Sequence, residues 1–165
     1  MDFSAEHRFA APPDRVAAAM TDPAFAPRLV ELPDVGAAEA LGSGRDGPVS
    51  WLRVRLAYDG QLDPVAQRVL GGDEVAWIQE YRLDAARLTG TVDITPERHQ
   101  GLLRCGAALR LIPDADGTRR TMTGRLEVRV PLVGGRAERA LAPAILRRVD
   151  IEADLLDTWM RSGDG

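Results

Sequence analysis

The feature that most limits how this 165-residue chain can fold is a long helical pattern at its C-terminal end. From residue 136 to residue 161, apolar side chains recur at helical spacing and so share one face: Leu141, Ile145, Val149, Ala153, Leu156 and Met160. Such a helix is about 40 Å long and needs a partner surface as wide as a small domain. We expect Pro143 to kink it or to mark a second start. Trp159 and Met160 are adjacent, so we expect only one of them to face inward.

Most of the remaining chain is predicted to form antiparallel strands, which would supply that partner surface. Residues 2–9 alternate apolar with polar side chains, the pattern of a half-buried strand. Further strand-like segments, separated by turns rich in Gly, Pro and Asp, span residues 35–43, 49–58, 74–83, 87–95, 102–112 and 118–130. The last pair forms the clearest hairpin, with its turn from Asp114 to Gly117. The sequence therefore predicts an antiparallel sheet of about seven strands.

Two short helices are expected between the first and second strands. Pro13 opens one that extends to Met20, because proline suits the first turn of a helix. Asp22 is a good N-cap for the next helix, which Pro33 ends. Residues 60–72 interrupt the strand pattern with apolar residues at helical spacing, and we expect a short lid-like helix there.

Composition supports a single domain spanning residues 1–165. Hydrophobic residues make up 45% of the chain and charged residues 28%, which is typical of a globular protein. The length suits one core better than two. No apolar run approaches the roughly 18 residues of a membrane span, and residues 1–9 lack the apolar stretch of a signal peptide. We therefore expect a cytoplasmic α+β protein without integral membrane association.

The charged and sulfur-containing residues exclude several classes of function. All 21 basic residues are Arg, so a lysine Schiff base and a P-loop lysine are impossible. Cys105 is the only cysteine, so the chain has neither an intrachain disulfide nor a cysteine-based zinc site. The net charge is −4 and the arginines are spread among carboxylates, so we expect no nucleic-acid partner.

The residue types that most often perform catalysis are isolated in this sequence. His7 and His99, the only histidines, lack any spacing that would place two ligands on one metal, and no Gly-x-Ser-x-Gly motif occurs. His7 alternates with apolar residues and is expected to be a hydrogen-bonded core histidine, whereas His99 is expected in a surface turn. We therefore assign no catalytic residue, no metal and no cofactor.

Local motifs at both ends of the chain add to this order of elements. Pro13 starts a helix that is followed by the turn Thr21-Asp22-Pro23, and residues 130–138 read VPLVGGRAE, followed later by Glu152 and Trp159. Together they resemble the helix-grip fold of the START-like (SRPBCC) superfamily, which includes polyketide cyclases, Bet v 1-like proteins and Aha1-like co-chaperones. The closing segment is similar to an uncharacterised actinobacterial family within it. The resemblance implies a cavity between the concave face of the sheet and the C-terminal helix, used for lipids, polyketides or other apolar molecules.

The inward faces of the predicted strands and helix indicate which residues would line such a cavity. Trp77, Gln79 and Tyr81 share one face of a strand and would supply aromatic walls and a polar group, with core packing as the alternative. Gly90 and Gly124 would leave space on inward faces, or would mark bulges. The full candidate set is Trp77, Gln79, Tyr81, Gly90, Val92, Ala107, Leu109, Met122, Gly124, Leu126, Val149, Ala153 and Leu156.

We predict that the chain binds or carries a small hydrophobic molecule, such as a lipid or polyketide, which enters near residues 60–72. One alternative is a polyketide cyclase-like or aromatase-like enzyme, which requires polar side chains to converge in the cavity, with the candidates Tyr58, Gln79, Tyr81 and His7. Another is an Aha1-like protein-interaction module, for which Trp51 on the expected outer face is the indication. The sequence carries no signal for an oligomeric state.

Overall fold

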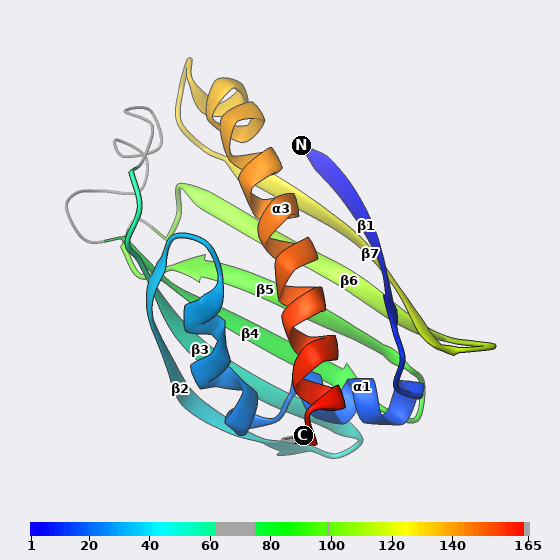
Figure 1. Ribbon diagram of the computed structural model, residues 1–165. Coiled ribbons are helices and arrows are strands. Elements are labelled where there is room, and N and C mark those ends of the chain that lie inside the picture. Colours follow the sequence, from blue (N-terminus) through cyan, green and yellow to red (C-terminus); the bar gives the residue numbers. More distant parts are fainter. Residues whose placement is uncertain (62–74, 99, 164–165) are drawn as a thin grey trace.

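The computed structural model describes residues 1–61, 75–98 and 100–163. Within them a curved antiparallel sheet carries a long helix across its concave face (Figure 1). In chain order the elements are β1 (Asp2–Phe9), α1 (Pro13–Met20), the 3₁₀ helix η1 (Pro23–Glu31), β2 (Val35–Asp46), β3 (Val49–Tyr58), β4 (Ala76–Asp84), β5 (Thr89–Pro96), β6 (Leu103–Asp114), β7 (Gly117–Val128) and α3 (Gly134–Arg161). The predicted α+β helix-grip architecture is confirmed.

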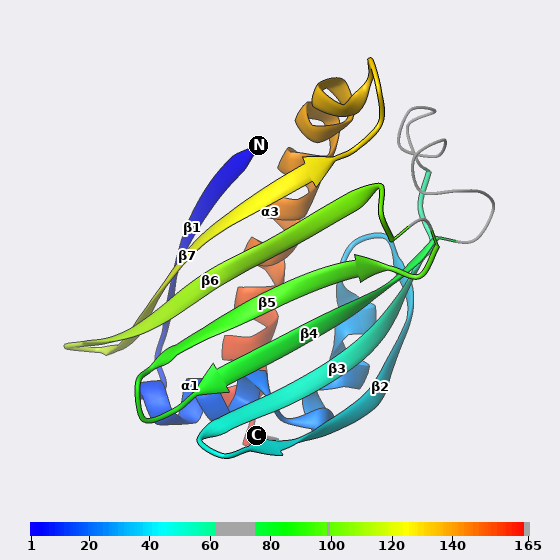
Figure 2. The ribbon, with the colours of Figure 1, turned by 180° about the vertical axis from the view of Figure 1, so that it is seen from behind.

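The strand order places the first strand beside the last one. Among the described residues the order is β1-β7-β6-β5-β4-β3-β2, so each strand from β2 to β7 lies beside its neighbour in sequence. β1 closes the far edge by pairing with β7, from Asp2 opposite Arg125 to Phe9 opposite Thr118. No described helix covers the convex face of the sheet (Figure 2). The apolar face of α3 therefore packs on the concave side alone.

The predicted strands are present in the predicted order, with shifted boundaries. β2 continues to Asp46, beyond the predicted end at residue 43. β6 and β7 pair as far as Asp114 opposite Gly117, so the predicted turn between these two residues is confirmed. Gly117 has φ +142°, and a Cβ there would lie 2.0 Å from the carbonyl oxygen of Phe9. Only glycine fits at this position, where the hairpin meets the end of β1.

The helices α1 and η1 form a further layer at one end of the sheet. Asp22 caps η1 as predicted, because its carboxylate accepts a hydrogen bond from the amide of Ala24 at 2.8 Å. Pro27 lies inside η1 and has no amide hydrogen to donate, which is consistent with a 3₁₀ rather than an α-helical segment. Phe25 and Leu29 of η1 are buried against the sheet and α3.

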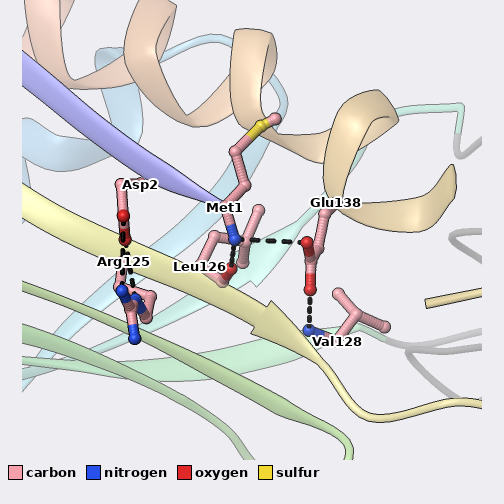
Figure 3. A network of polar contacts seen from close by, with 6 residues as sticks. All are labelled: Met1, Asp2, Arg125, Leu126, Val128 and Glu138. Carbon is pink, nitrogen blue, oxygen red and sulfur yellow. Dashed lines mark hydrogen bonds and ion pairs between the residues drawn. The ribbon is translucent and has the colours of Figure 1, made fainter. Parts of the chain in front are cut away.

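α3 begins at Gly134 and continues without interruption through Pro143, so the predicted second start is wrong. Pro143 and Arg139 are both exposed. The Arg139 carbonyl, which loses its amide partner to the proline, can therefore be solvated by water. The first turns of α3 are held to the sheet by Glu138, whose carboxylate accepts hydrogen bonds from the Val128 amide and the Met1 ammonium at 3.0 and 3.2 Å (Figure 3).

Trp159 and Met160 are both buried, which corrects the expectation that only one of them faces inward. α3 contacts β1 and β7 of the sheet and also the short helices α1 and η1. The Trp159 ring packs on Phe25 of η1, with the ring centroids 5.3 Å apart. Adjacent helix residues point about 100° apart, so a helix with neighbours on two sides can bury both.

Two of the predictions fall on residues outside those the structure describes. The lid-like helix is expected at residues 60–72, most of which lie in the range 62–74 that the structure does not describe. The expected surface turn includes His99, which the structure also does not describe. Among the helices that the structure describes, none is both long enough and apolar enough to cross a bilayer.

Candidate functional site

A group of buried polar side chains lies beneath the middle of α3, and it is called the polar cluster here. Gln79 and Tyr81 reach it from β4, where alternation places them on the inward face. Arg120 reaches it from β7 by the same alternation, two residues before the buried Met122. Arg148 and Glu152 come from successive turns of α3 and so point in the same direction. The polar cluster comprises Gln79, Tyr81, Arg120, Arg148 and Glu152.

Glu152 is the acceptor that ties the helix to β4. Its carboxylate accepts a hydrogen bond from the Tyr81 hydroxyl at 2.8 Å and another from the Gln79 amide nitrogen at 3.1 Å. That nitrogen also donates to the Tyr81 hydroxyl oxygen, and the Gln79 carbonyl oxygen accepts from the Arg148 guanidinium. Burial, followed by the nearby Glu152 carboxylate, raises the pKa of Tyr81 well above its usual value. Tyr81 therefore stays a neutral hydroxyl donor to Glu152.

Arg120 is a charged residue in the core, with 2% of its surface exposed. Its guanidinium lies 5.3 Å from the centroid of the Phe9 ring, and one of its nitrogens lies 3.9 Å from the sulfur of Met20. Burial lowers the pKa of Arg120 and the Glu152 charge opposes that effect, although an arginine keeps its proton at neutral pH. Its Nε is buried and has no hydrogen-bond partner among the described residues. Arg120 therefore has donors to spare.

His7 is hydrogen bonded and half-buried, as the sequence predicts. Its Nδ1 lies 3.2 Å from the Arg120 guanidinium, which can only donate, so Nδ1 accepts and the proton resides on Nε2. Nε2 then donates to the Asp150 carboxylate at 2.9 Å. Burial, and then the Arg120 charge, lower the pKa of His7. His7 is therefore neutral at neutral pH and does not offset the Arg120 charge.

A cavity of about 230 Å³, called the larger cavity here, adjoins the polar cluster. Its walls come from the first half of α3, from β4, β5 and β6, from the end of β3, and from the segment that precedes β2. Most of the lining is apolar, and the polar lining residues in the described chain are Asp34, Tyr58, Cys105, Arg147 and Arg148. The apolar lining consists of Pro33, Val75, Ala76, Trp77, Ile94, Pro96, Leu103, Leu141, Ala144 and Ile145.

A smaller cavity of about 40 Å³ lies directly against the polar cluster. Ile94, Ile145 and Arg148 line both cavities, so Arg148 stands where they meet. The remaining walls of the smaller cavity are formed by Gln79, Val92, Arg120, Met122, Val149 and Glu152. Its volume suits one or a few water molecules, or one small chemical group.

Trp77 forms the floor beneath Arg148. The Arg148 guanidinium lies 4.6 Å from the centroid of the Trp77 ring, which is a cation–π arrangement. The Trp77 Nε1 is buried and has no hydrogen-bond partner among the described residues. Arg148 and Trp77, neither of which can accept a hydrogen bond through its nitrogens, therefore lie against each other, and both residues line the larger cavity.

The predicted lining residues divide between the cavities and the packed core. Trp77 lines the larger cavity, while Gln79, Val92, Met122 and Val149 line the smaller one. The others lie in the apolar core without lining either cavity: Tyr81, Ala107, Leu109, Leu126, Ala153 and Leu156.

Gly90 and Gly124 do not leave the space that their small size suggested. A Cβ on Gly90 would lie 2.3 Å from the Arg82 carbonyl oxygen, and one on Gly124 would lie 2.4 Å from the Phe3 ring. Neither glycine lies at a register shift of the described strands, so the bulge interpretation is also wrong. Both glycines permit close packing, with neighbouring atoms already occupying the volume.

Sequence reasoning missed the charged members of the polar cluster, although Arg120 and Glu152 each left a signal. Arg120 has the same strand parity as the predicted inward residue Met122. Glu152 follows Val149 by three positions and precedes Leu156 by four, which puts a carboxylate on the apolar face of the helix. Among the described residues, no group of three or more His, Cys, Asp or Glu side chains is placed to hold a metal ion.

Comparison with known proteins agrees with this architecture. The family described as "Protein of unknown function (DUF2505)" matches residues 4–160. The Mycobacterium tuberculosis H37Rv protein Rv0481c, described as uncharacterized, is 27% identical over 145 residues, which cover 81% of this chain and 80% of that protein. The names of this family and this relative assign no activity.

Solved structures show the same fold at low sequence identity. The protein TTHA0849 of Thermus thermophilus has a TM-score of 0.68 and 20% identity, with both chains fully covered. The ZhuI aromatase/cyclase of Streptomyces sp. R1128 has a TM-score of 0.66 and 18% identity, with 96% of this chain and 92% of that chain covered. The predicted fold is thereby confirmed.

Proposed function

We propose that this chain, which belongs to the family described as "Protein of unknown function (DUF2505)", binds a small, largely apolar molecule in the larger cavity. The name of the family assigns no activity, so the proposal rests on the interior of the protein. The supporting observation is an apolar space with a few polar groups at its margin, which is the usual composition of a ligand site. Protein cores are otherwise packed to nearly crystalline density. An apolar space of this size is therefore a candidate ligand site.

The volume limits the size of that occupant. A cavity of about 230 Å³ is below the range of roughly 300 to 1,000 Å³ that drug-sized ligands fill. One water or methylene group takes roughly 30 Å³, so the described walls accommodate about eight non-hydrogen atoms. A medium-length alkyl chain or a single substituted ring has this size.

The binding test uses 1-octanol, a neutral probe whose chain matches this volume. We expect isothermal titration calorimetry to show one molecule bound per chain, with native mass spectrometry giving the same stoichiometry. Ile145→Trp should abolish binding because the indole would occupy the cavity that Ile145 lines. Ala140→Trp is the matched control, since Ala140 is an exposed residue of the same helix and lines neither cavity. Equal octanol binding by the wild type and Ile145→Trp would contradict the proposal.

Enzymatic cyclisation is a second candidate, favoured by one specific observation. Gln79 and Tyr81 converge on a buried carboxylate, Glu152, beside the smaller cavity, which partly meets the requirement for converging polar groups. Tyr58 lines the larger cavity and His7 lines neither. A carboxylate in such a place can remove a proton from carbon next to a carbonyl group.

The proton-transfer candidate is tested with cyclohexanone, which has the size of the larger cavity. In deuterated water, catalysed exchange of the α-hydrogens would be followed by NMR. Exchange that the wild type accelerates and Glu152→Gln does not would favour an enzyme. Exchange at the uncatalysed rate in both would leave binding as the function.

A protein-interaction role receives no support from the described surface. The Trp51 ring packs across the outer face of β2, 3.0 Å from the position that a Cβ of Gly44 would take, and so it is half-buried. The large apolar residues that are exposed lie on separate elements rather than in one patch: Met1, Val30, Leu41 and Leu132.

A further inference from the structure

We infer that the natural ligand carries a carboxylate, which Arg148 binds where the larger and smaller cavities meet. This inference rests on the proposed binding function and adds the chemical class of the ligand. It would be a short amphiphile whose tail lies in the larger cavity and whose carboxylate points towards the polar cluster.

The charges within the polar cluster do not balance. Arg120 and Arg148 bring two positive charges and Glu152 brings one negative charge. His7 is neutral, and Asp150 is exposed and hydrogen bonded to His7. The described ion pairs include neither guanidinium, and the cluster has an excess positive charge beneath α3. A buried charge without a partner is unfavourable, so an anion entering here would be stabilised.

Arg148 has hydrogen-bond donors that suit a carboxylate. A guanidinium has five N–H donors in a planar arrangement that suits a carboxylate. Within the described chain, Arg148 donates to the Gln79 carbonyl oxygen, while the Trp77 ring holds its plane from one side. Arg148 is thus oriented by a neutral partner and an aromatic surface, and its remaining donors are available at the wall of both cavities.

Trp77, another residue of the same wall, carries a second donor. Trp77 Nε1 is buried without an acceptor among the described residues, although Trp77 lines the larger cavity. A buried donor of this kind normally has a partner. Because guanidinium and indole groups cannot accept hydrogen bonds, this part of the wall favours an acceptor-rich anion over an amine or an alcohol. The carboxylate of Asp34, in the segment that precedes β2, also lines the larger cavity.

Size selects a carboxylate among the common anions. The smaller cavity holds about 40 Å³, about the volume of the two oxygens of a carboxylate whose carbon lies where the cavities meet. The two oxygens of a carboxylate match a single guanidinium in a bidentate pair. A phosphate or sulfate group is larger and presents more oxygens than one arginine can satisfy.

The test compares octanoate, 1-octanol, octylamine and octyl phosphate in calorimetric titrations of the full chain. We expect octanoate to bind at least about tenfold more tightly than octanol, because a charge-assisted hydrogen bond adds to the same tail contacts. Arg148→Gln should remove that advantage, so that the ratio of octanoate to octanol affinity falls to about one. Arg139→Gln is the matched control, since Arg139 is an exposed arginine of the same helix that lines neither cavity, and it should retain the preference.

A second variant keeps the test decisive if Arg148→Gln is unstable. Trp77→Phe keeps an aromatic ring beneath Arg148 and removes the indole N–H, so the ratio of octanoate to octanol affinity should fall a few-fold. Equal affinities for octanoate and octanol, or a preference for octylamine, would overturn the inference while the binding function stands. Tighter binding of octyl phosphate would overturn the carboxylate assignment. Failure of all four probes to bind would instead contradict the proposed function itself.

Discussion

The two halves of α3 cross the same sheet but bury it differently. In the second half, called the packed half, Ala153, Leu156, Trp159 and Met160 are all nearly inaccessible to solvent. In the first half, called the cavity half, Leu141 and Ile145 are only half-buried and line the larger cavity. The same helix therefore fills the interior at one end and leaves it hollow at the other.

The difference follows from what else covers the sheet. α1 and η1 pack against the sheet and the last turns of α3, so side chains from three directions meet there. Beside the cavity half, a smaller core cluster forms from β6, β7 and the first turns of α3: Leu103, Cys105, Leu126, Val128, Ala137 and Ala142. The polar cluster lies at the boundary between the two. Cavity formation in this fold thus depends on the reach of the short helices as well as on the long one.

The largest expected effect separates the two halves by stability. Leu156→Ala should lower the free energy of unfolding by about 2–5 kcal/mol, because it removes buried volume from a packed region. Ile145→Ala should cost only about 1 kcal/mol, since Ile145 is half-buried and already borders empty space. Urea unfolding followed by circular dichroism measures both. Equal losses would show that the cavity half is as tightly packed as the packed half.

The next effect concerns the boundary itself. Glu152→Gln keeps the shape of the side chain but removes the negative charge that faces two arginines. It should destabilise the fold by about 2 kcal/mol, because a buried hydrogen-bonded charge loses its complement. Asp154→Asn, on the exposed side of the same helix, should change stability by less than about 0.5 kcal/mol. If the two variants behave alike in urea unfolding, the polar cluster contributes little to holding α3.

The pH dependence of the unfolding free energy should report on His7. Its pKa in the folded chain is lowered from about 6.5, so the unfolded chain binds more protons near that pH. The stability that neutral His7 confers is therefore complete above about pH 6.5 and is lost as the pH falls through the lower, folded value. His7→Gln should flatten the unfolding free energy over this range. An unchanged slope in that variant would assign the dependence to other groups.

The smallest effect uses Cys105, which lines the larger cavity, as a reporter. Burial raises the pKa of its thiol to about 11, so little reactive thiolate exists at pH 8. Iodoacetamide should label it about a hundredfold more slowly than a free cysteine with a pKa near 9. Saturating 1-octanol should slow labelling further, as measured by mass spectrometry. Labelling that octanol leaves unchanged would place the probe outside the larger cavity.

Much of the architecture could be predicted from local pattern. Alternation in the strands placed Gln79 and Tyr81 on the inward face of β4, and helical spacing located α3 to within two residues of its start. These patterns hold because each strand or helix has one face to bury, whatever its neighbours are. The same reasoning treated charged residues as solvated, which is the usual outcome, and so it passed over Arg120 and Glu152.

By itself, then, the sequence determined the order of elements, the face that each one buries and the absence of lysine chemistry. Only the tertiary structure decided that Arg120, Arg148 and Glu152 meet under α3, and that a cavity lies beside them at one end of the sheet. The physical reason is that periodicity describes a single element. Burial of a charge and the filling of a volume depend instead on which other elements arrive from distant parts of the chain.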